Sequence, residues 1–598
     1  MNFANAAALF VAAVFCLCGC GKKSETEVVS SENSATNYPL PDPPYVAPAH
    51  PGNAGGRFIV ATWGDPKSFN PITANEVSSL DISRFLFASL LGYDYISQEV
   101  EPGLADSWTH SPDGKTWMFH LRKNLRWSDG APLTAEDVAF TWNDIVFNPK
   151  IVSPTRDLFI INGKAFTVTN LDDLTIQVTT PEVYAPFLEN FGGVPILPKH
   201  VLQKSVADGT FDSAYSVNWK PEDIVGSGPF RLKAYATSQY ALLERNPYFF
   251  EVDSNGQRLP YFDDIAYTIV PDKNTISLRF LSGECDVNDF IFPHQYDEYK
   301  AKAATGNFRL LEPGTGLETD FLWFNQNTNV NPHTGKPYVD PVKLKWFRNV
   351  KFRQAVSYAI NREALVQSVY AGRAVPNYGF ITPGNKKWYD PNIMTYPYNP
   401  DKARELLKEI GMEDRKGDGF LEDADGHPVE FIFNTDTDND SRMKAAVLIL
   451  QDFKKIGFHV TFQPLDFNTQ INKLDSTYDY ECVLMGLGAG GTDPSSDMNV
   501  FKSSGFTHLW FPQEKSPSTD WEARIDTLMD DQMQTLDTAT RRKEFDEVQE
   551  ILAREQPVIF TVTPEYFAAI RSDVGNVRAS ALSYYRATWN IEELYFKK

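Results

Sequence analysis

The segment that decides the fold is Pro102–Trp142, which reads PGLADSWTHSPDGKTWMFHLRKNLRWSDGAPLTAEDVAFTW. Within it, Trp117, Phe119 and Leu121 alternate with their more polar neighbours. This two-residue period predicts a half-buried β-strand. Asp113-Gly114 stands just before the strand and predicts a tight turn at its start.

The second half of the same segment predicts a turn followed by a helix. The turn falls at Ser128–Gly130, and Thr134 is then placed to cap a helix whose third residue is Asp137. Three apolar residues fall on one face of that helix, namely Val138, Trp142 and Ile145. Elsewhere, predicted strands and helices alternate for most of the chain, which favours an α/β fold with mixed sheets.

These features together resemble the conserved block of the family 5 extracellular solute-binding proteins, the peptide- and oligopeptide-binding components of ABC importers. The resemblance continues through residues 58–598. The further segments that carry it are Ser68–Pro71 (SFNP), Gly226–Leu232 (GSGPFRL), Leu281–Val287 (LSGECDV), Phe352–Val366 (FRQAVSYAINREALV), Tyr398–Leu407 (YNPDKARELL) and Tyr478–Gly486 (YDYECVLMG). It implies a two-lobed, periplasmic-binding-protein-like fold with three domains and a hinge made of two chain crossings.

The family's architecture implies the following division of this chain. Domain I comprises residues 56–95, 226–312 and 565–598, domain II is an insertion at 96–225, and domain III covers 313–564. The two hinge crossings are expected near Glu312–Phe321 and Pro557–Glu565, which are extended segments rich in β-forming residues.

The second half of the chain predicts three helices from apolar periodicity and capping residues. One begins at Asn399-Pro400, buries Ala403, Leu406, Leu407 and Ile410, and ends at Gly411. A second buries Met443, Ala446, Val447 and Leu450 and ends before Gly457. The third is expected to run unbroken from Phe352 to Tyr370.

Length and composition restrict the class of protein. A chain of 598 residues with 42% hydrophobic residues is expected to build more than one core. Its net charge of -22 argues against a nucleic-acid partner, because no basic stripe is present to neutralise phosphates. We expect a monomer without cofactors.

The N-terminus is predicted to be a targeting segment. Residues 1–19 contain an apolar run that ends in Leu17-Cys18-Gly19-Cys20 and resembles a bacterial lipobox, although residues 1–10 lack Lys and Arg. The resemblance implies cleavage before Cys20, a diacylglycerol on its sulfur, and anchoring by lipid at the periplasmic face of the cell envelope. Ordinary signal-peptide cleavage that releases a free protein is the alternative. Residues 20–55, which are rich in Ser and Pro, are expected to form a flexible tether.

Two cysteines, Cys285 and Cys482, follow the N-terminal segment, and both lie in strand-like runs. A disulfide between them and two buried free thiols are both compatible with the sequence.

Motifs for catalysis and metal binding are absent or incomplete. The sequence has no HExxH motif and no phosphate-binding loop. Ser441–Lys444 matches the SxxK pattern of penicillin-binding enzymes, but a helix start explains it. Asp414–Asp425 resembles a calcium loop, yet Lys416 occupies a position that should supply an oxygen ligand. We therefore expect a protein that is not an enzyme and has no metal site.

The segment Gly486–Asp497, GLGAGGTDPSSD, is the most diagnostic for the ligand. Peptide-binding relatives usually carry an aspartate four residues before the proline, and its carboxylate holds the α-ammonium group of the ligand. Gly490 occupies that position here. Either Asp493 or Asp497 replaces the missing charge, or the ligand has no α-ammonium and the glycines make room for a sugar.

Aromatic residues beside the predicted hinge and lobe edges are further candidates, because they provide apolar area for a ligand with little loss of rotamer freedom. The candidate ligand-binding residues are Asp493, Gly490, Asp497, Trp323, Asn325, Trp63, Trp388 and Trp510.

The resemblance implies a substrate-binding lipoprotein of an ABC importer. It would capture a peptide between two lobes, close around it, and deliver it to a membrane permease driven by an ATPase. An oligosaccharide-binding protein of such an importer and a ligand sensor with the same fold are the alternatives.

Overall fold

The computed structural model describes residues 38–598, apart from residues 75, 152, 154, 155, 162, 488–490, 506 and 513. The predicted signal peptide, Cys20 and the first part of the predicted tether lie outside the described residues. All elements below belong to the unit Pro39–Lys598.

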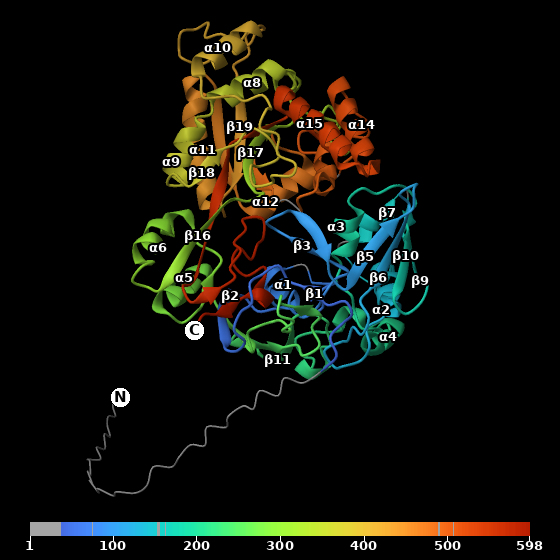
Figure 1. The fold of residues 1–598 in the computed structure, drawn as a ribbon. Helices are drawn as coiled ribbons and strands as arrows, with labels where there is room; N and C mark the ends of the chain where they lie inside the picture. Colours follow the sequence, from blue (N-terminus) through green and yellow to red (C-terminus); the bar gives the residue numbers. More distant parts are fainter. Residues whose placement is uncertain are drawn as a thin grey trace, which may run out of the picture. The chain divides into compact units, whose positions relative to one another are not determined.

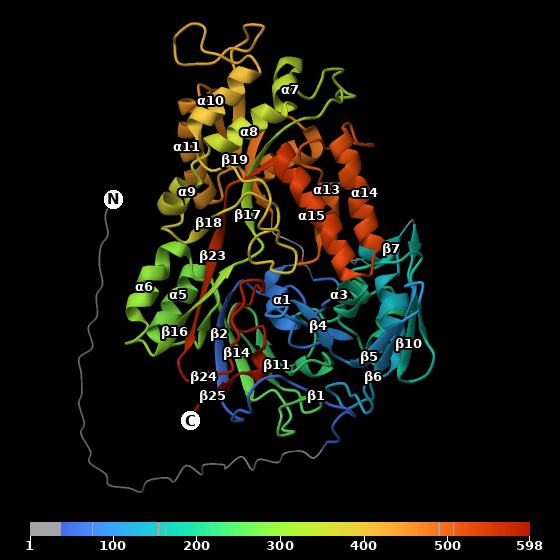
Figure 2. The same ribbon diagram turned by 45° about the horizontal axis from the view of Figure 1, so that its top comes forward.

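The largest sheet has eight strands and mixes parallel and antiparallel pairs. Its main path runs in the order β11 (Phe230–Ala236), β12 (Tyr240–Arg245), β14 (Asp264–Val270), β2 (Arg57–Trp63), β15 (Val287–Asn288), β23 (Val562–Arg571) and β16 (Phe308–Thr315). The eighth strand, β18 (Ala374–Pro376), pairs with β23, and Figure 2 shows β23 extending from β16 to β18. Strands widely separated in sequence therefore share this sheet.

A four-stranded antiparallel sheet contains the segment that opened the sequence analysis. Its order is β5 (Ala105–His110), β6 (Thr116–Leu121), β10 (Thr175–Thr179) and β9 (Thr167–Asn170). The predicted strand is confirmed as β6, with Trp117, Phe119 and Leu121 all buried. The predicted helix is α2 (Ala135–Phe140), where Thr134 and Asp137 form a capping box, and it continues as a π-helical turn, η1 (Thr141–Val146). The three apolar residues on its predicted face are fully buried.

A five-stranded sheet forms the centre of the second lobe. Its order is β20 (His459–Leu465), β19 (Glu430–Asp436), β21 (Cys482–Leu487), β17 (Thr319–Phe324) and β22 (Val558–Phe560). Two hydrophobic cores use opposite sides of β17, because Leu322 and Phe324 belong to one core and Phe321 and Trp323 belong to the other. Figure 1 shows the helices of this lobe around β17 and β19.

The longest helices, α11 (Asp440–Lys455), α14 (Asp520–Gln534) and α15 (Thr538–Glu555), belong to the second lobe. In the first lobe the helices are α1 (Val77–Ser83), α2, α3 (Phe187–Gly192), α4 (Lys199–Ala207), α5 (Lys273–Ser282) and α6 (Tyr296–Lys302). In the second lobe they are α7 (Pro341–Phe347), α8 (Val350–Ala359), α9 (Arg362–Val369), α10 (Pro400–Glu409), α11, α12 (Phe467–Asn472), α13 (Met498–Phe501), α14 and α15. None of the helices in the described part of the chain has the length and apolar character that crossing a membrane requires.

Two of the helices predicted in the second half agree with the structure. Helix α10 begins after Asn399, whose side chain accepts a hydrogen bond from the backbone of Lys402, and Gly411 adopts a left-handed conformation beyond its end. Helix α11 lies where it was expected, but its buried face is rotated: Ala445 and Ile449 are buried, whereas Val447 is 46% exposed.

The third predicted helix is wrong in one respect, because it is two helices. Helix α8 ends at Ala359, and α9 begins after Asn361. The side chain of Asn361 accepts a hydrogen bond from the backbone N–H of Ala364, which makes it the N-cap of a new helix. A capping asparagine in the middle of an apolar pattern therefore divides the helix.

The predicted tether is wrong for its second half. Strand β1 (Tyr45–Val46) pairs with β13 (Glu251–Val252), and Ala47 is buried in the core of the first lobe. The Pro43 carbonyl accepts a hydrogen bond from Arg122. The carbonyl groups of an extended, proline-rich segment have no hydrogen-bond partners within the segment itself. Such a segment therefore packs against a folded domain where side chains or strands supply N–H donors.

At two places the chain passes directly between the eight-stranded and five-stranded sheets, with no helix in between. Strand β16 ends at Thr315 and β17 begins at Thr319, while β22 ends at Phe560 and β23 begins at Val562. The two crossings lie side by side, because the Thr561 hydroxyl donates to the backbone oxygen of Asp320 at 2.7 Å. The exact domain boundaries given above remain predictions.

The two cysteines are free and buried. Cys285 packs in a small core beside β2, and Cys482 lies in the main core of the second lobe. Burial raises the pKa of the Cys285 thiol to about 11, and burial likewise raises the pKa of Cys482. Of the two possibilities that the sequence left open, the structure has free thiols.

Candidate functional site

Segments of the two lobes meet where the hairpin of β3 (Leu91–Asp94) and β4 (Glu99–Pro102) reaches the second lobe. At its tip, the Gln98 side chain donates to the Gly384 carbonyl at 3.0 Å and accepts from the Lys387 backbone at 3.1 Å. The Tyr93 hydroxyl lies 2.7 Å from the hydroxyl of Thr492. These polar contacts join the lobes at a region that includes the diagnostic loop.

Asp493 in that loop forms a buried ion pair with Arg541 of α15. The two guanidinium nitrogens Nη1 and Nη2 donate to the two carboxylate oxygens at 2.8 and 2.9 Å, and each side chain is 8% exposed. Asp493 also accepts the backbone N–H of Ser495 and so caps the short helical turn that follows. Because both of its oxygens are engaged, Asp493 holds the loop in place and has little capacity left for a ligand.

Glu189 of α3 brings a carboxylate from the first lobe to the same loop. Its Oε1 accepts a hydrogen bond from the Thr492 hydroxyl at 3.2 Å. Burial and, next, the negative charge of Asp493 raise the pKa of Glu189 to about 7. No sequence signal marked this residue, because it stands 303 residues before Thr492 and belongs to no ligand motif.

Asp497 supplies a second carboxyl group in the loop. It ends the helical turn Pro494–Asp497, designated η7, and is 9% exposed. Burial, followed by the charge of Asp493, raises its pKa to about 7. The Asp493–Arg541 pair is thus accompanied by two carboxyl groups whose pKa values are raised to about 7.

Gly490, the residue at the position of the usual aspartate, lies outside the described residues. The next residue, Gly491, is described, and a Cβ atom placed on it would lie 3.8 Å from Oε1 of Glu189. The Glu189 carboxylate therefore lies close to Gly491 of this loop.

Four of the candidate residues are core residues of the second lobe in this structure: Trp323, Trp388 and Trp510, each 1% exposed, and Asn325, which is fully buried. Asn325 donates to the carbonyls of Tyr478 and Tyr480, and the indole of Trp510 donates to Glu522. In this conformation these side chains present almost no surface to a solute. The ring of Trp388 packs near the ion-pair partner of Asp493, since the Arg541 guanidinium lies 5.0 Å from its ring centroid.

Trp63 is the exception among the aromatic candidates, because it is 37% exposed. It ends β2, and the ammonium group of Lys273 lies 5.1 Å from its ring centroid. The same ammonium group lies 5.1 Å from the ring of Phe290. A ligand role for Trp63 and for the other candidates remains a prediction.

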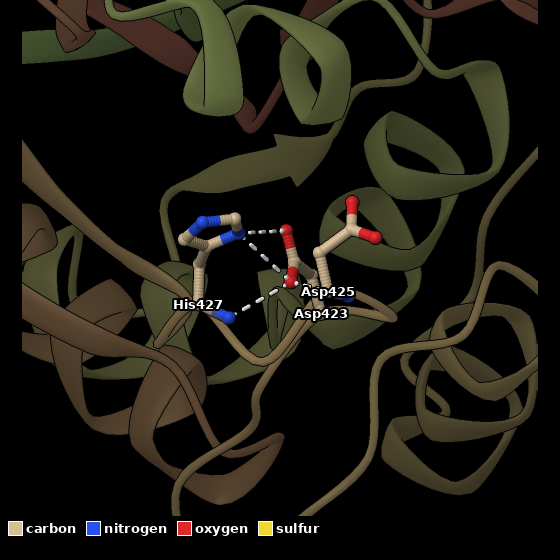
Figure 3. A group of neighbouring side chains, drawn as sticks. All are labelled: Asp423, Asp425 and His427. Carbon is tan, nitrogen blue, oxygen red and sulfur yellow. Dashed lines mark hydrogen bonds and ion pairs between the residues drawn. The ribbon is translucent and has the colours of Figure 1, made fainter.

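The segment that resembles a calcium loop folds into two turns. Asp414 accepts backbone N–H groups of residues 417, 418 and 419, as a turn-forming aspartate does. Figure 3 shows Asp423, Asp425 and His427 together, with Asp423 bonded to the backbone and the ring of His427. Asp423 also accepts from the Trp346 indole, so its oxygens are already used within the turn.

Comparison with known proteins identifies the family that this architecture represents. The profile of the bacterial extracellular solute-binding proteins, family 5, matches residues 99–508. A probable ABC transporter-binding protein of Deinococcus radiodurans is 32% identical over 486 residues, which cover 77% of this chain and 80% of that protein. The oligopeptide-binding protein AppA of Bacillus subtilis is 26% identical over 557 residues, covering 91% of this chain and 92% of AppA.

Solved structures share the two-lobed fold. AppA of Bacillus subtilis in complex with a nonapeptide superimposes with a TM-score of 0.66 at 24% identity, covering 92% of this chain and all of AppA. The periplasmic binding protein MelB of Agrobacterium fabrum in complex with stachyose gives a TM-score of 0.70 at 22% identity, covering 93% of this chain and 88% of MelB. At these identities the likeness concerns the fold, which confirms the predicted two-lobed α/β architecture.

Proposed function

This chain belongs to family 5 of the bacterial extracellular solute-binding proteins, and from that premise we propose that it captures a peptide for an ABC importer. It binds the solute between its lobes, closes, and delivers it to a permease that is driven by an ATPase. It performs no chemistry on the solute.

The observation that carries the choice of a peptide is the position of Glu189. Its carboxylate stands beside Gly491, next to the position at which peptide-binding relatives carry their aspartate. Asp497 adds a second carboxyl group in the same loop. A free α-ammonium group would form a charge-assisted hydrogen bond with one of these carboxylates.

The same geometry explains how a ligand would favour closure. Glu189 belongs to the first lobe and Thr492 to the second, so their contact forms only when the lobes meet. Burying an ionised carboxylate without a partner is costly, and this burial raises the pKa values of Glu189 and Asp497. An ammonium group removes the penalty and therefore binds the closed state better than the open state. The two crossings at residues 315–319 and 560–562 are the segments that would bend.

An oligosaccharide is the second candidate. The sequence has glycine where peptide-binding relatives usually carry an aspartate, and MelB of Agrobacterium fabrum was solved in complex with stachyose. A third candidate function is a ligand sensor that uses the same fold without a permease. Permease and ATPase genes beside the gene for this protein would exclude it.

We also propose that the chain acts at the periplasmic face of the envelope as a monomer. Cleavage before Cys20 and lipidation of its sulfur would anchor it to the membrane. Metabolic labelling with a fatty-acid analogue tests this proposal: label is expected on the intact protein and should be lost on Cys20→Ala.

Native mass spectrometry with three ligand pools tests the choice of solute. The purified protein is incubated with free peptides of mixed length, with the same peptides N-acetylated, and with oligosaccharides. We expect saturable adducts with free peptides, and affinities at least about tenfold lower after acetylation, because acetylation removes the charged hydrogen bond.

The pools separate the alternatives. Adducts with oligosaccharides alone would favour the sugar reading. Equal binding of free and acetylated peptides would retain a peptide ligand but would show that neither Glu189 nor Asp497 holds an α-ammonium group.

A further inference from the structure

We propose that His508, Glu514 and Glu522 bind a divalent transition-metal ion inside the second lobe, with zinc as the best fit. One ligand atom from each residue can be chosen so that all three lie within 4.8 Å of one another. This proposal does not depend on the solute, because none of the three residues belongs to the loop that contains Asp493. No metal motif marked them in the sequence, where they are separated by five and seven residues.

The three side chains are buried and come from one stretch of chain around the start of α14. The side chain of His508 is fully buried, that of Glu514 is 2% exposed, and residue Glu522 is 3% exposed. Nε2 of His508 lies 3.4 Å from Oε2 of Glu514. Two atoms bound to one tetrahedral zinc at about 2.1 Å are separated by roughly 3.4 Å, so this pair already has the spacing of two zinc ligands.

The imidazole of His508 is oriented as a ligand would be. Its Nδ1 lies 3.0 Å from the backbone carbonyl of Val500. A carbonyl only accepts hydrogen bonds, so Nδ1 must carry the proton. In the neutral imidazole, Nε2 then presents a lone pair toward the Glu514 carboxylate, and a cation between the two removes the repulsion. Metal-binding histidines commonly use their second nitrogen in this way.

Glu514 is the observation that most directly indicates a missing partner. Neither of its carboxylate oxygens has a hydrogen-bond partner among the residues that the structure describes. Nε2 of His508 likewise has none within that part of the chain. Buried carboxylates are normally hydrogen-bonded, paired or bound to metal, because an isolated buried charge is costly.

Glu522 is held in place by its own hydrogen bonds. Its Oε1 accepts from the Trp510 indole at 2.9 Å, and its Oε2 accepts from the hydroxyls of Ser518 and Thr519 at 3.0 and 2.7 Å. A carboxylate oxygen has a further lone pair for a metal. Such supporting hydrogen bonds orient metal ligands and are typical of built sites.

Charge balance supports a cation. Two carboxylates and a neutral imidazole carry a charge of -2, which one divalent ion neutralises. Arg353 is a charged neighbour of Glu522, but its guanidinium donates to the carbonyls of Glu555 and Phe347 and to Gln326 instead. An imidazole ligand together with carboxylates suits zinc and its neighbours in the first transition row, whereas calcium and magnesium prefer oxygen ligands alone.

Elemental analysis of the purified full-length protein tests the site. The protein is stripped with a chelator, reloaded with Zn²⁺ and desalted, and the metal is counted. We expect about one zinc per chain, as for a single built site, and loss of that zinc in Glu514→Gln. The chelator should also lower the melting temperature of the unsubstituted protein but leave that of Glu514→Gln unchanged.

The matched control is His427→Asn. It removes the histidine of the second group of potential ligands, Asp423, Asp425 and His427, which is more exposed. The control should keep its zinc. Zinc that is lost from His427→Asn but kept by Glu514→Gln would overturn the proposal, as would a protein that takes up no zinc.

X-ray absorption at the zinc edge of the His427→Asn protein tests the site without Glu514→Gln, in case that variant does not fold, because the only other group of potential ligands among the described residues then has no histidine. We expect one imidazole and otherwise oxygen neighbours at about 2.0–2.2 Å. A spectrum without an imidazole, or with two or more, would contradict the assignment.

Discussion

Replacing Arg541 with methionine is expected to lower the free energy of unfolding by about 3–5 kcal/mol, the range for breaking a buried ion pair at one partner. The substitution keeps most of the apolar stem of the side chain but removes both hydrogen bonds to Asp493. It also removes the bonds from Arg541 to the backbone and side chain of Gln532 at the end of α14. Asp493 then remains buried without a counter-charge, which is the main source of the loss. Urea denaturation followed by tryptophan fluorescence measures the effect.

Arg524→Met is the matched control, because Arg524 makes the same kind of pair on the surface. It donates to Glu547 at 2.7 and 2.8 Å from α14 to α15, with side chains 47% and 42% exposed. Its loss should cost less than about 1 kcal/mol.

The double variant Asp493→Asn with Arg541→Met separates the pair from its surroundings. It should recover part of the stability that Arg541→Met loses, because it removes the unpaired charge. A loss for Arg541→Met no larger than that of Arg524→Met would contradict the structural role given to the pair.

Local elements of the fold could be predicted because their determinants lie close together in sequence. The capping box of Thr134 and Asp137, the alternation in β6 and the Asn399 cap of α10 each need only a few adjacent residues. The break at Asn361 was missed because the apolar pattern continues across it, although the capping residue was visible. The docking of residues 39–55 depends on donors such as Arg122, which composition does not reveal.

Burial of the aromatic candidates could not be predicted, because it depends on what covers each face of a strand. Neighbouring residues of β17 enter different cores, with Trp323 on one side and Phe324 on the other. A strand that is buried on both faces has no exposed side from which a tryptophan could reach a solute. The sequence shows that Trp323 lies in a strand, but not that a second core covers it.

The group of carboxylates formed by Glu189, Asp493 and Asp497 could be predicted only in part, for a similar reason. The sequence shows glycine at position 490 and offers Asp493 and Asp497 as candidate replacements for the missing charge. Asp493 is instead occupied by Arg541, 48 residues further along the chain. Glu189 comes from the other lobe, and only the folded chain brings it beside Thr492.

Glu189→Gln is therefore expected to weaken the binding of free peptides about 10- to 100-fold, the loss of a charged hydrogen bond of about 1.5–3 kcal/mol. Glutamine keeps the size and the hydrogen bond from Thr492 but removes the negative charge. Binding of N-acetylated peptides should change little, because they have no ammonium group for the carboxylate to hold. Isothermal titration calorimetry of both peptide types measures the difference.

The pH dependence of binding gives a second readout with a definite sign. The pKa of Glu189 is raised to about 7 in this structure, and only the ionised carboxylate attracts an ammonium group. Affinity for free peptides should thus be highest near pH 7.5, should fall as the pH decreases through 7, and should also fall above about pH 8, where the α-ammonium group loses its proton. From about pH 6 to 7.5 most peptide amino groups remain protonated, so the ligand contributes little to this change.

The control for the charge itself is Glu99→Gln. Glu99 also joins the lobes, since it pairs with Lys387 at 3.2 Å, but its side chain is 62% exposed. Screening by solvent makes that pair weak, and its loss should alter peptide affinity by less than about fivefold, or 1 kcal/mol.

Glu189→Gln should flatten the pH profile, and any dependence that remains belongs to Asp497, whose pKa is also raised to about 7. Unchanged affinity and an unchanged profile in Glu189→Gln would show that the first lobe does not supply the missing carboxylate, and would leave Asp497 to hold the ammonium group.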